Sequence, residues 1–359
     1  MKSIIFLVNS APEFAGVQRY ILNTAKELEK RGFSAYIWSS TNPFFMSKLK
    51  NSNIKYFEYK GSVLSLGNIY KLLKLIKKNN TKIVHANLGK SAIVGAILKK
   101  LTNIKKLVFT QHFISPASTS LANSSVKRYI AKFLYRHVYS KYDRIIAIST
   151  DVADKIMERK ESSSKKIEII YNGIPAVAQK IIENKKSASV LVICRLQKEK
   201  NIYGLLNIMA AIKSDCDFNM KILGSGKEEQ SLLDLSKNLK LDNHIEFCGH
   251  VEDTAKYYNK ASFLVHPAKN EPFGLVLIEA MSAKLPIITF NSGGPKDIVE
   301  DGVTGFLVNS DIEMKEKIIE LLENKDKRQK MGQAAYERYK SVFTIEKMVD
   351  SLMKIYEDK

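Results

Sequence analysis

Residues 270–281 read Asn-Glu-Pro-Phe-Gly-Leu-Val-Leu-Ile-Glu-Ala-Met, a turn that leads into a helix and carries two carboxylates. Pro272 and Gly274 stand where a helix would begin, and apolar residues then recur at helical spacing. Glu271 therefore lies in the loop before the predicted helix, and Glu279 lies inside the helix. If the helix began at Glu271, the two residues would be roughly 12 Å apart along its axis.

The start of this helix is a candidate anion site. Backbone N–H groups from about Phe273 to Val276 have no partner within a helix, and the helix dipole favours negative charge there. A diphosphate would fit such a site, and a nearby carboxylate would accept hydrogen bonds from sugar or ribose hydroxyls. The alternative is structural, with Glu271 as a capping residue and Glu279 facing solvent.

Short apolar runs typical of buried strands surround this stretch in the second half of the chain. They are Val190–Ile193, Asn219–Leu223, His244–Cys248, Ser262–His266, Pro286–Phe290 and Thr304–Val308. Helix-like segments lie between them, and this alternation predicts a parallel sheet covered by helices on both faces.

The first half of the chain repeats the same alternation. Its strand-like runs are Ile4–Val8, Ser34–Trp38, Ile54–Tyr59, Lys82–Ala86, Lys106–Thr110, Arg144–Ile148 and Ile167–Ile170. A polar, basic stretch at 176–189 interrupts the pattern and is the predicted linker. We therefore predict two Rossmann-like α/β domains, 1–178 and 185–343, with a cleft between them and a final helix, 344–359, that crosses back onto the first domain.

Cations and glycine turns follow several strands of the second domain. Arg195 and Lys200 come after its first strand, where this architecture places its ligand crevice. Gly224-Ser-Gly226 and Gly293-Gly-Pro295 each follow a later strand. Taken singly, the cations are also consistent with a surface cluster, and glycine turns are common in any protein.

Two residues of the first domain are candidates for ligand contact. Gly16 follows the first strand and precedes a helix starting near Val17, where a glycine lets a ligand approach the backbone. His112 follows the strand Lys106–Thr110 at the crevice end of the sheet. A lone histidine in that position is equally consistent with a structural role.

The composition is that of a globular protein without membrane spans. The chain has 359 residues, of which 45% are hydrophobic and 26% charged. No apolar run approaches the ~20 residues that cross a bilayer, and the N-terminal apolar stretch lacks the features of a signal peptide. Three isolated cysteines form neither a metal-ligand spacing nor a disulfide framework, which fits a reducing cytoplasm.

The positive charge is concentrated in the first half. Residues 1–180 contain 31 Lys and Arg against 10 Asp and Glu, whereas the remainder contains 26 against 27. This asymmetry indicates an anionic partner such as a membrane surface, although it is also consistent with a charge that serves solubility. Residues 126–144 predict a helix in which cations alternate with Tyr129, Ile130, Phe133, Leu134, His137 and Val138. Such a helix suits a membrane interface, unless its apolar face packs on the sheet.

Together these positions resemble the retaining glycosyltransferases of family four, which have the GT-B fold. The resemblance covers nearly the whole chain. Its most specific part is the Glu-x7-Glu motif, Glu271 to Glu279, supported by Arg195 and Lys200. Ala15 stands where the family's glycine loop usually has its first glycine, and His266-Pro267 stands where the family often has Pro-Ser.

The resemblance implies a role for each candidate. Arg195 and Lys200 would hold the donor diphosphate, near Gly224 and Gly16. Glu279 would bind the ribose, and residues near Val251 the base. Glu271 and the backbone of Phe273, Gly274 and Leu275 would hold the donor sugar. His112 would contact the transferred sugar from the other domain, and no metal or other cofactor would be needed.

The predicted reaction is sugar transfer from a nucleotide sugar to a glycan or lipid-linked acceptor. A UDP-sugar is the first choice of donor and GDP-mannose the second, and the expected setting is bacterial surface polysaccharide or lipopolysaccharide assembly at the cytoplasmic face of the membrane. The alternatives are a nucleotide-sugar epimerase or phosphorylase on the same fold, or a basic nucleic-acid-binding protein. No zinc-finger spacing or aromatic RNA-binding signature supports the nucleic-acid reading.

Overall fold

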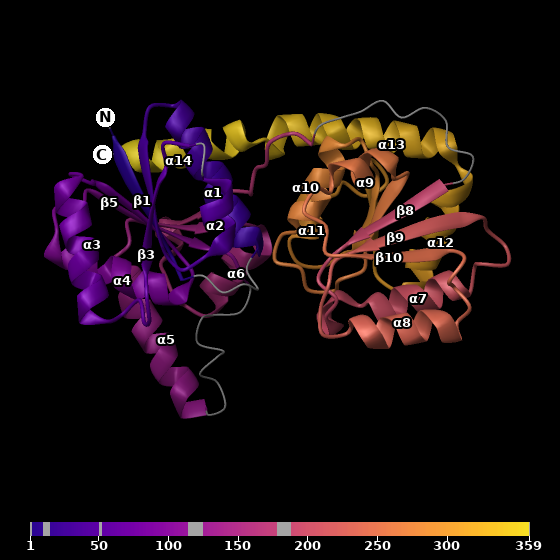
Figure 1. Cartoon of the computed structure of the whole chain (residues 1–359), viewed down its shortest axis with the longest axis horizontal. Coiled ribbons are helices and arrows are strands. Elements are labelled where there is room, and N and C mark those ends of the chain that lie inside the picture. The colour runs from indigo at the N-terminus through magenta and orange to yellow at the C-terminus, as the bar shows by residue number, and fades with distance from the viewer. Residues whose placement is uncertain (1, 10–14, 50–51, 114–124, 178–187, 359) are drawn as a thin grey trace. The chain divides into compact units, whose positions relative to one another are not determined.

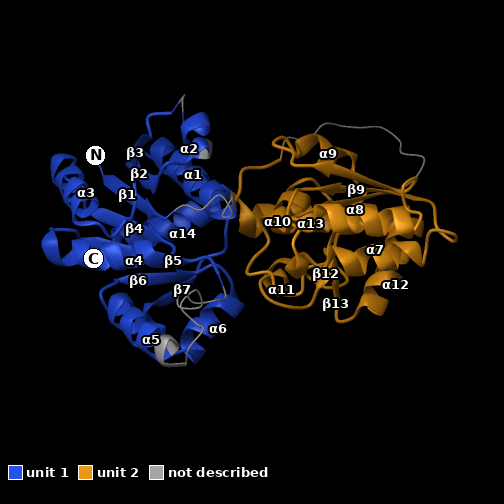
Figure 2. Cartoon of the chain, turned by 60° about the horizontal axis from the view of Figure 1, so that its bottom comes forward, with its two compact units in different colours: residues 1–173, 345–359 blue, residues 174–344 orange. Residues whose placement is uncertain are grey.

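The computed structural model describes residues 2–9, 15–49, 52–113, 125–177 and 188–358, which divide into two compact units (Figure 2). Unit 1 comprises residues 1–173 and 345–359, and unit 2 comprises residues 174–344. The division at Gly173 falls slightly before the stretch at 176–189 that the sequence indicated, and residues 178–187 lie outside the described part. No helix in the described part of the chain combines the length and apolarity needed to cross a bilayer.

Unit 1 is built on a parallel sheet with strand order β3-β2-β1-β4-β5-β6-β7 (Figure 1). Its strands are β1 Ser3–Val8, β2 Ser34–Ser40, β3 Lys55–Tyr59, β4 Ile83–Asn87, β5 Lys106–Gln111, β6 Arg144–Ala147 and β7 Ile167–Ile169. Its helices are α1 Ala15–Lys30, α2 Pro43–Lys48, α3 Leu66–Lys78, α4 Gly89–Leu101, α5 Ser125–Ser140, α6 Thr150–Glu158 and α14 Ile345–Glu357.

Helices cover this sheet because its strands are apolar on both sides. Every residue of β1 is buried, as expected for a central parallel strand. A core on one face joins β1 and β2 to α1, α2 and α14. The helices α3, α4 and α5 are successive neighbours. The C-terminal helix α14 is thus an integral part of unit 1, and its Met348, Val349 and Leu352 belong to this core.

Unit 2 is built on a parallel sheet with strand order β10-β9-β8-β11-β12-β13. Its strands are β8 Ala188–Ile193, β9 Phe218–Leu223, β10 Ile245–Gly249, β11 Phe263–His266, β12 Ile287–Phe290 and β13 Gly305–Val308. Its helices are α7 Ile202–Ala210, α8 Glu229–Asn238, α9 Ala255–Lys260, α10 Leu275–Ser282, α11 Pro295–Ile298, α12 Asp311–Glu323 and α13 Lys325–Arg338. The 3-10 turn Lys198–Lys200 precedes α7, and a π-helical turn, Tyr339–Phe343, follows α13.

The α/β architecture predicted from the sequence is confirmed. Each of the predicted strands is present within two residues of its expected bounds. Two local expectations were wrong. The first helix begins at Ala15, so Gly16 lies in its first turn rather than before it. The helix after Glu271 begins at Leu275 with Gly274 as its N-cap, so the helical estimate of the distance between Glu271 and Glu279 does not apply.

Candidate active site

The carboxyl ends of the unit 2 strands bring together the candidates of that unit. Parallel strands of an open α/β sheet place their carboxyl ends at one edge, where ligands of this architecture bind. Arg195 and Lys200 follow β8, Gly224 follows β9, Val251 follows β10 and Glu271 follows β11. The sequence placed these residues at one edge, but only the tertiary structure determines which of them make contact.

Lys200 and Glu271 form an ion pair at this edge. The Lys200 Nζ lies 2.6 Å from Glu271 Oε2, and the two side chains are 14% and 15% exposed. Lys200 ends the 3-10 turn, after which Asn201 adopts a left-handed backbone and α7 begins. This turn directs the lysine back across the edge of the sheet to a residue that is distant in sequence.

His266 makes a second contact with the same carboxylate. It is the last residue of β11 and is buried, and its Nε2 lies 3.3 Å from Glu271 Oε2. Burial alone would raise the pKa of Glu271, but the hydrogen bond from His266 and the charge of Lys200 lower it to about 2. Glu271 is therefore a weakly basic carboxylate. The contact with His266 could not be anticipated, although the sequence did show that this position departs from the family pattern.

Glu279 is buried, so the alternative in which this residue faces solvent is wrong. It lies in the second turn of α10, and its Oε2 accepts a hydrogen bond of 2.7 Å from the Tyr258 hydroxyl. Tyr258 is fully buried in α9. Sequence reasoning missed this tyrosine, which carried no signal beyond its place in an amphipathic segment.

Two glycine turns allow the loops at this edge to approach one another closely. Gly224 has a φ of +132°, and a Cβ there would lie 1.8 Å from the Cys194 carbonyl oxygen. Gly293 has a φ of +63°, and a Cβ there would lie 2.3 Å from the Glu271 carbonyl oxygen. At both positions the positive φ and the nearby carbonyl oxygen each exclude a side chain. The turn after β12 thereby fixes the backbone of Glu271.

The start of α10 lies beside this carboxylate. Gly274 precedes the helix with a φ of +103°, and Leu275 is its first residue. Phe273 is 2% exposed, and its ring packs against Phe343 at 6.3 Å between centroids. Only the backbone of Phe273 is therefore suited to contact a ligand. The free N–H groups begin closer to Gly274 than the sequence suggested, because Phe273 precedes the helix.

The other candidate cation, Arg195, is exposed, and within the described residues no carboxylate lies at ion-pair distance from it. Val251 is partly buried and follows the turn at Gly249. Burial raises the pKa of the neighbouring Cys194 thiol to about 12, so this cysteine stays protonated. In the part of the chain that the structure covers, no three His, Cys, Asp or Glu residues are grouped so as to hold a metal ion.

His112 occupies the corresponding edge of the unit 1 sheet, directly after β5. Its Nε2 lies 2.9 Å from Asn87 Oδ1, at the end of β4, and the Tyr20 ring packs edge-on at 4.9 Å. Asn87 Nδ2 donates to the His85 carbonyl oxygen, which turns Oδ1 toward His112. His112 Nε2 therefore carries the proton, and Nδ1 is left as an acceptor.

Burial lowers the pKa of His112 to about 3, so the imidazole is neutral at physiological pH. A second histidine, His85, lies behind it with both ring nitrogens engaged. The Tyr356 hydroxyl of α14 lies 2.6 Å from Nδ1, and the Thr110 hydroxyl lies 2.6 Å from Nε2. The C-terminal helix thus supports the strands that hold His112. Gly16 is exposed at the start of α1, and residues 10–14 before it lie outside the described part.

Two solved structures share this fold over nearly their whole length. A glycosyltransferase from Rickettsia africae has a TM-score of 0.86 at 22% identity, with 99% of this chain and 98% of that chain covered. HepE of Anabaena, solved in complex with UDP, has a TM-score of 0.81 at 20% identity with both chains fully covered. The chain therefore has the two-domain, Rossmann-like GT-B fold.

Family models and relatives give the more specific assignment. Residues 173–338 match the family described as glycosyl transferases group 1, and residues 14–176 match glycosyltransferase family 4. The chain belongs to this family-4 type of glycosyltransferase.

Several relatives match most of the chain. An uncharacterized glycosyltransferase of Methanocaldococcus jannaschii is 27% identical over 97% of this chain and 95% of its own. The capsular polysaccharide biosynthesis glycosyltransferase CapM of Staphylococcus aureus is 27% identical over 81% and 80%. An alpha-monoglucosyldiacylglycerol synthase of Streptococcus pneumoniae is 22% identical over 90% and 78%.

Proposed function

We propose that the protein transfers a sugar from a nucleotide-sugar donor to a glycan or lipid-linked acceptor, with retention of anomeric configuration and without a metal ion. The observation that carries this proposal is the Lys200–Glu271 pair, which lies at the carboxyl edge of the unit 2 sheet beside the start of α10. Cations, helix amides and a carboxylate at one edge suit a ligand that joins a diphosphate to a sugar.

Each side chain then has a definite role. Arg195 and Lys200 bind the donor diphosphate, and the first amides of α10 add their dipoles. Glu279, oriented by Tyr258, accepts hydrogen bonds from the ribose hydroxyls. The base lies near Val251, beyond the Gly224 turn.

The donor sugar binds at the same edge of unit 2. The Glu271 carboxylate accepts hydrogen bonds from its hydroxyls, and the backbone N–H groups of Phe273, Gly274 and Leu275 donate to them. In unit 1, the neutral His112 contacts the transferred sugar, and the backbone at Gly16 admits the donor phosphate.

In the reaction, the bond between the anomeric carbon and the phosphate oxygen breaks, and the nucleoside diphosphate leaves with the electron pair. The acceptor hydroxyl oxygen forms the new bond to that carbon, and its proton passes to the departing phosphate oxygen. Arg195, Lys200 and the α10 amides stabilise the negative charge that grows on this phosphate, which is the main catalytic effect.

Attack on the same face as the leaving group accounts for retention. A covalent route would need a carboxylate nucleophile, and Glu271 is poorly suited because Lys200 and His266 hold its pKa at about 2. Low basicity of this carboxylate favours a role in binding the sugar.

A UDP-sugar is the first choice of donor, supported by the UDP complex of HepE, and GDP-mannose is the second. The capsular glycosyltransferase among the relatives supports a role in bacterial surface polysaccharide assembly, with lipopolysaccharide as one such product. The diacylglycerol-directed relative supports a lipid acceptor. A lipid-linked acceptor would place the protein peripherally on the inner face of the cytoplasmic membrane.

A thermal-shift panel of UDP, GDP and ADP tests the donor assignment. A ligand that binds only the folded state stabilises it by RT ln(1 + [L]/Kd), so the correct nucleotide raises the melting temperature most. We expect UDP to give the largest shift in the wild type and a smaller shift in Lys200→Ala. Failure of all three to stabilise the protein would contradict the donor proposal. Isomerised donor without acceptor would identify an epimerase instead.

A further inference from the structure

Among the described residues, helix α5 of unit 1 packs one apolar side on the sheet and leaves a second apolar side exposed. Ala131, Tyr135, Val138 and Tyr139 are all at most 5% exposed. Tyr139 stacks on Phe109 of β5 at 5.1 Å between ring centroids. These side chains anchor the helix on the unit 1 sheet.

The other side carries large apolar residues in solvent. Tyr129, Ile130, Phe133 and Leu134 are 74%, 60%, 71% and 43% exposed. Of the apolar face expected from the sequence, only the placement of Val138 was wrong, because this residue belongs to the packed side. We call these four residues the α5 ridge. Contiguous exposed apolar residues of this kind mark an interaction surface, whereas isolated ones do not.

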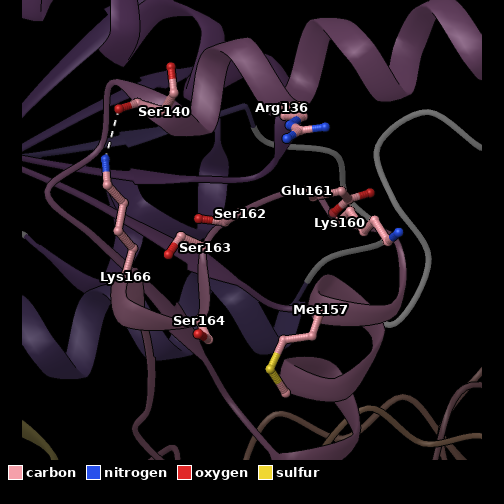
Figure 3. Close-up of a pocket in the computed structure, with 9 residues that line it drawn as sticks. All are labelled: Arg136, Ser140, Met157, Lys160, Glu161, Ser162, Ser163, Ser164 and Lys166. Atoms are coloured by element: carbon pink, nitrogen blue, oxygen red, sulfur yellow. Dashed lines mark hydrogen bonds between the residues drawn. The ribbon is translucent and has the colours of Figure 1, made fainter.

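A cavity of about 540 Å³ adjoins the C-terminal half of α5. Figure 3 shows Arg136 and Ser140 of α5 on one side and the loop after α6 on the other. That loop contributes Lys160, Lys166 and the hydroxyls of Ser162, Ser163 and Ser164. Cations and hydroxyls outnumber the single carboxylate of the lining, that of Glu161, and such a lining suits a phosphate.

The charged groups of the cavity divide into those with partners and those without. Lys166 Nζ donates to the carbonyl oxygens of Ser140 and Tyr142 at 2.8 and 2.7 Å, which fixes the loop against α5. Glu161 is buried, with Arg159 at 4.0 Å. Among the described residues, neither Arg136 nor Lys160 has a carboxylate within ion-pair distance. These two cations are available to an external anion.

The ridge and the cavity form one continuous surface. Successive helix residues are rotated by about 100°, so Lys132 and Arg136 lie along the flank of α5 between the ridge and the cavity, and both are exposed. In Figure 1 the N-terminal half of α5 extends away from the unit 1 sheet. An apolar strip bordered by cations is the pattern of a helix that lies in a membrane interface.

We infer that the α5 ridge and the adjoining cavity dock unit 1 onto a bilayer of anionic phospholipid. The ridge enters the boundary between headgroups and acyl chains, while Arg136 and Lys160 bind headgroup phosphates. A second copy of this surface is a poor occupant because its cations would repel. The biological role of this docking rests on the proposed function, because it would bring unit 1 to a lipid-linked acceptor. Binding to the bilayer itself requires no donor.

Flotation of the full chain with vesicles tests this surface in the absence of any nucleotide. Wild type should float with phosphatidylcholine vesicles that contain phosphatidylglycerol, and not with phosphatidylcholine alone. Tyr129→Ser with Phe133→Ser should lower the bound fraction at least tenfold. Arg136→Glu with Lys160→Glu should do the same, since each cation near an anionic surface contributes roughly a fivefold factor.

Matched controls come from α3 of the same unit. Lys71→Glu with Lys78→Glu changes the net charge equally at two exposed sites, and Leu66→Ser with Tyr70→Ser removes comparably exposed apolar groups. Both controls should bind vesicles within about threefold of wild type. UDP binding and circular dichroism verify that every variant is folded.

Three outcomes would overturn the inference. Wild type could fail to bind phosphatidylglycerol vesicles at low salt, or the controls could lose as much vesicle binding as the α5 variants. Sedimentation could also reveal a dimer that the ridge substitutions dissociate. Because flotation uses no donor, a wild-type protein that binds UDP but does not float with phosphatidylglycerol vesicles refutes the docking surface alone. Vesicle binding without any nucleotide binding refutes the proposed function alone.

Discussion

The Nζ of Lys200 lies 2.6 Å from Oε2 of Glu271, joining the loop after the first strand of unit 2 to the loop after its fourth. His266 approaches the same oxygen. One carboxylate is thus held by two side chains at an edge where a donor diphosphate and sugar would meet. In the proposed site, a bound phosphate would share the charge of Lys200 with Glu271.

Substitution of Lys200 should impair catalysis while the protein remains folded. We expect Lys200→Ala to lower kcat/KM at least tenfold, because a charge-assisted hydrogen bond contributes roughly 1.5–3 kcal/mol and each 1.4 kcal/mol is about tenfold in rate. Lys198→Ala, at an exposed position of the same turn, should stay near wild type. Steady-state kinetics with matched circular dichroism provide the measurement. Equal kinetics in both variants would place the donor site elsewhere.

Glu279→Gln should lower kcat/KM to a similar extent while it preserves the fold. The amide oxygen can still accept the Tyr258 hydrogen bond, but the negative charge proposed to attract the ribose hydroxyls is lost. Tyr258→Phe serves as the control, since it removes the orienting hydroxyl and keeps the carboxylate. Nucleotide affinity from calorimetry should fall more in Glu279→Gln than in Tyr258→Phe. The reverse order would indicate that Glu279 is structural.

Glu271 should make stability depend on pH in the acid range. Its pKa is about 2 in the folded protein against an ordinary 4.5, so the stabilisation is present above 4.5 and is lost as pH falls toward 2. Between pH 6 and 4, the difference in unfolding free energy between wild type and Glu271→Gln should shrink by about 1 kcal/mol. Urea titrations at both pH values measure it. A constant difference would show that the carboxylate is not held in this way.

His112 should contribute to transfer rather than to nucleotide affinity. We expect His112→Ala to lower kcat by tenfold or more and to change the Kd for UDP by less than about threefold, a difference below 1 kcal/mol. Asn87→Ala, which frees Nε2 of the histidine, should give a smaller loss in the same direction. Calorimetry and initial rates separate the two quantities. Parallel losses in Kd and kcat would assign a structural role to His112.

Neutral burial of His112 should also destabilise the protein at mildly acidic pH. Its folded pKa of about 3 lies below the ordinary 6.5, so the unfolded chain takes up a proton first as pH falls. From pH 7.5 to 5, wild type should lose about 2 kcal/mol of unfolding free energy that His112→Asn does not lose. Denaturant titration at both pH values gives the difference. An identical loss in the variant would mean that this imidazole is not held neutral.

Transfer should survive removal of divalent metal ions. In the proposed site, Arg195, Lys200 and the α10 amides would supply the positive charge that a metal would otherwise place on the diphosphate. Activity in EDTA should remain within about twofold of the untreated enzyme, a change of less than 0.5 kcal/mol in the barrier. Complete loss in chelator with recovery on addition of Mn²⁺ or Mg²⁺ would refute this.

Local patterns were sufficient for much of the architecture. Runs such as Ile4–Val8 and Ser262–His266 predicted strands that the structure contains, because burial on both faces requires near-continuous apolar residues. The prediction of where α10 starts was less accurate, since Gly274 allows the chain to remain outside helical geometry until Leu275. Boundaries of this kind depend on backbone angles that the residue types permit but do not impose.

The sequence by itself determined the alternating strands and helices of both units and the chemical types that follow each strand: Arg195 and Lys200, Glu271, and His112. Only the tertiary structure decided which of these touch. The Lys200–Glu271–His266 contact, the Tyr356–His85 contact and the division of α5 into packed and exposed sides all join residues through the packing of separate elements. Periodicity reports which side of an element is apolar, but the neighbour that covers that side is fixed by strand order and helix placement, which are properties of the whole fold.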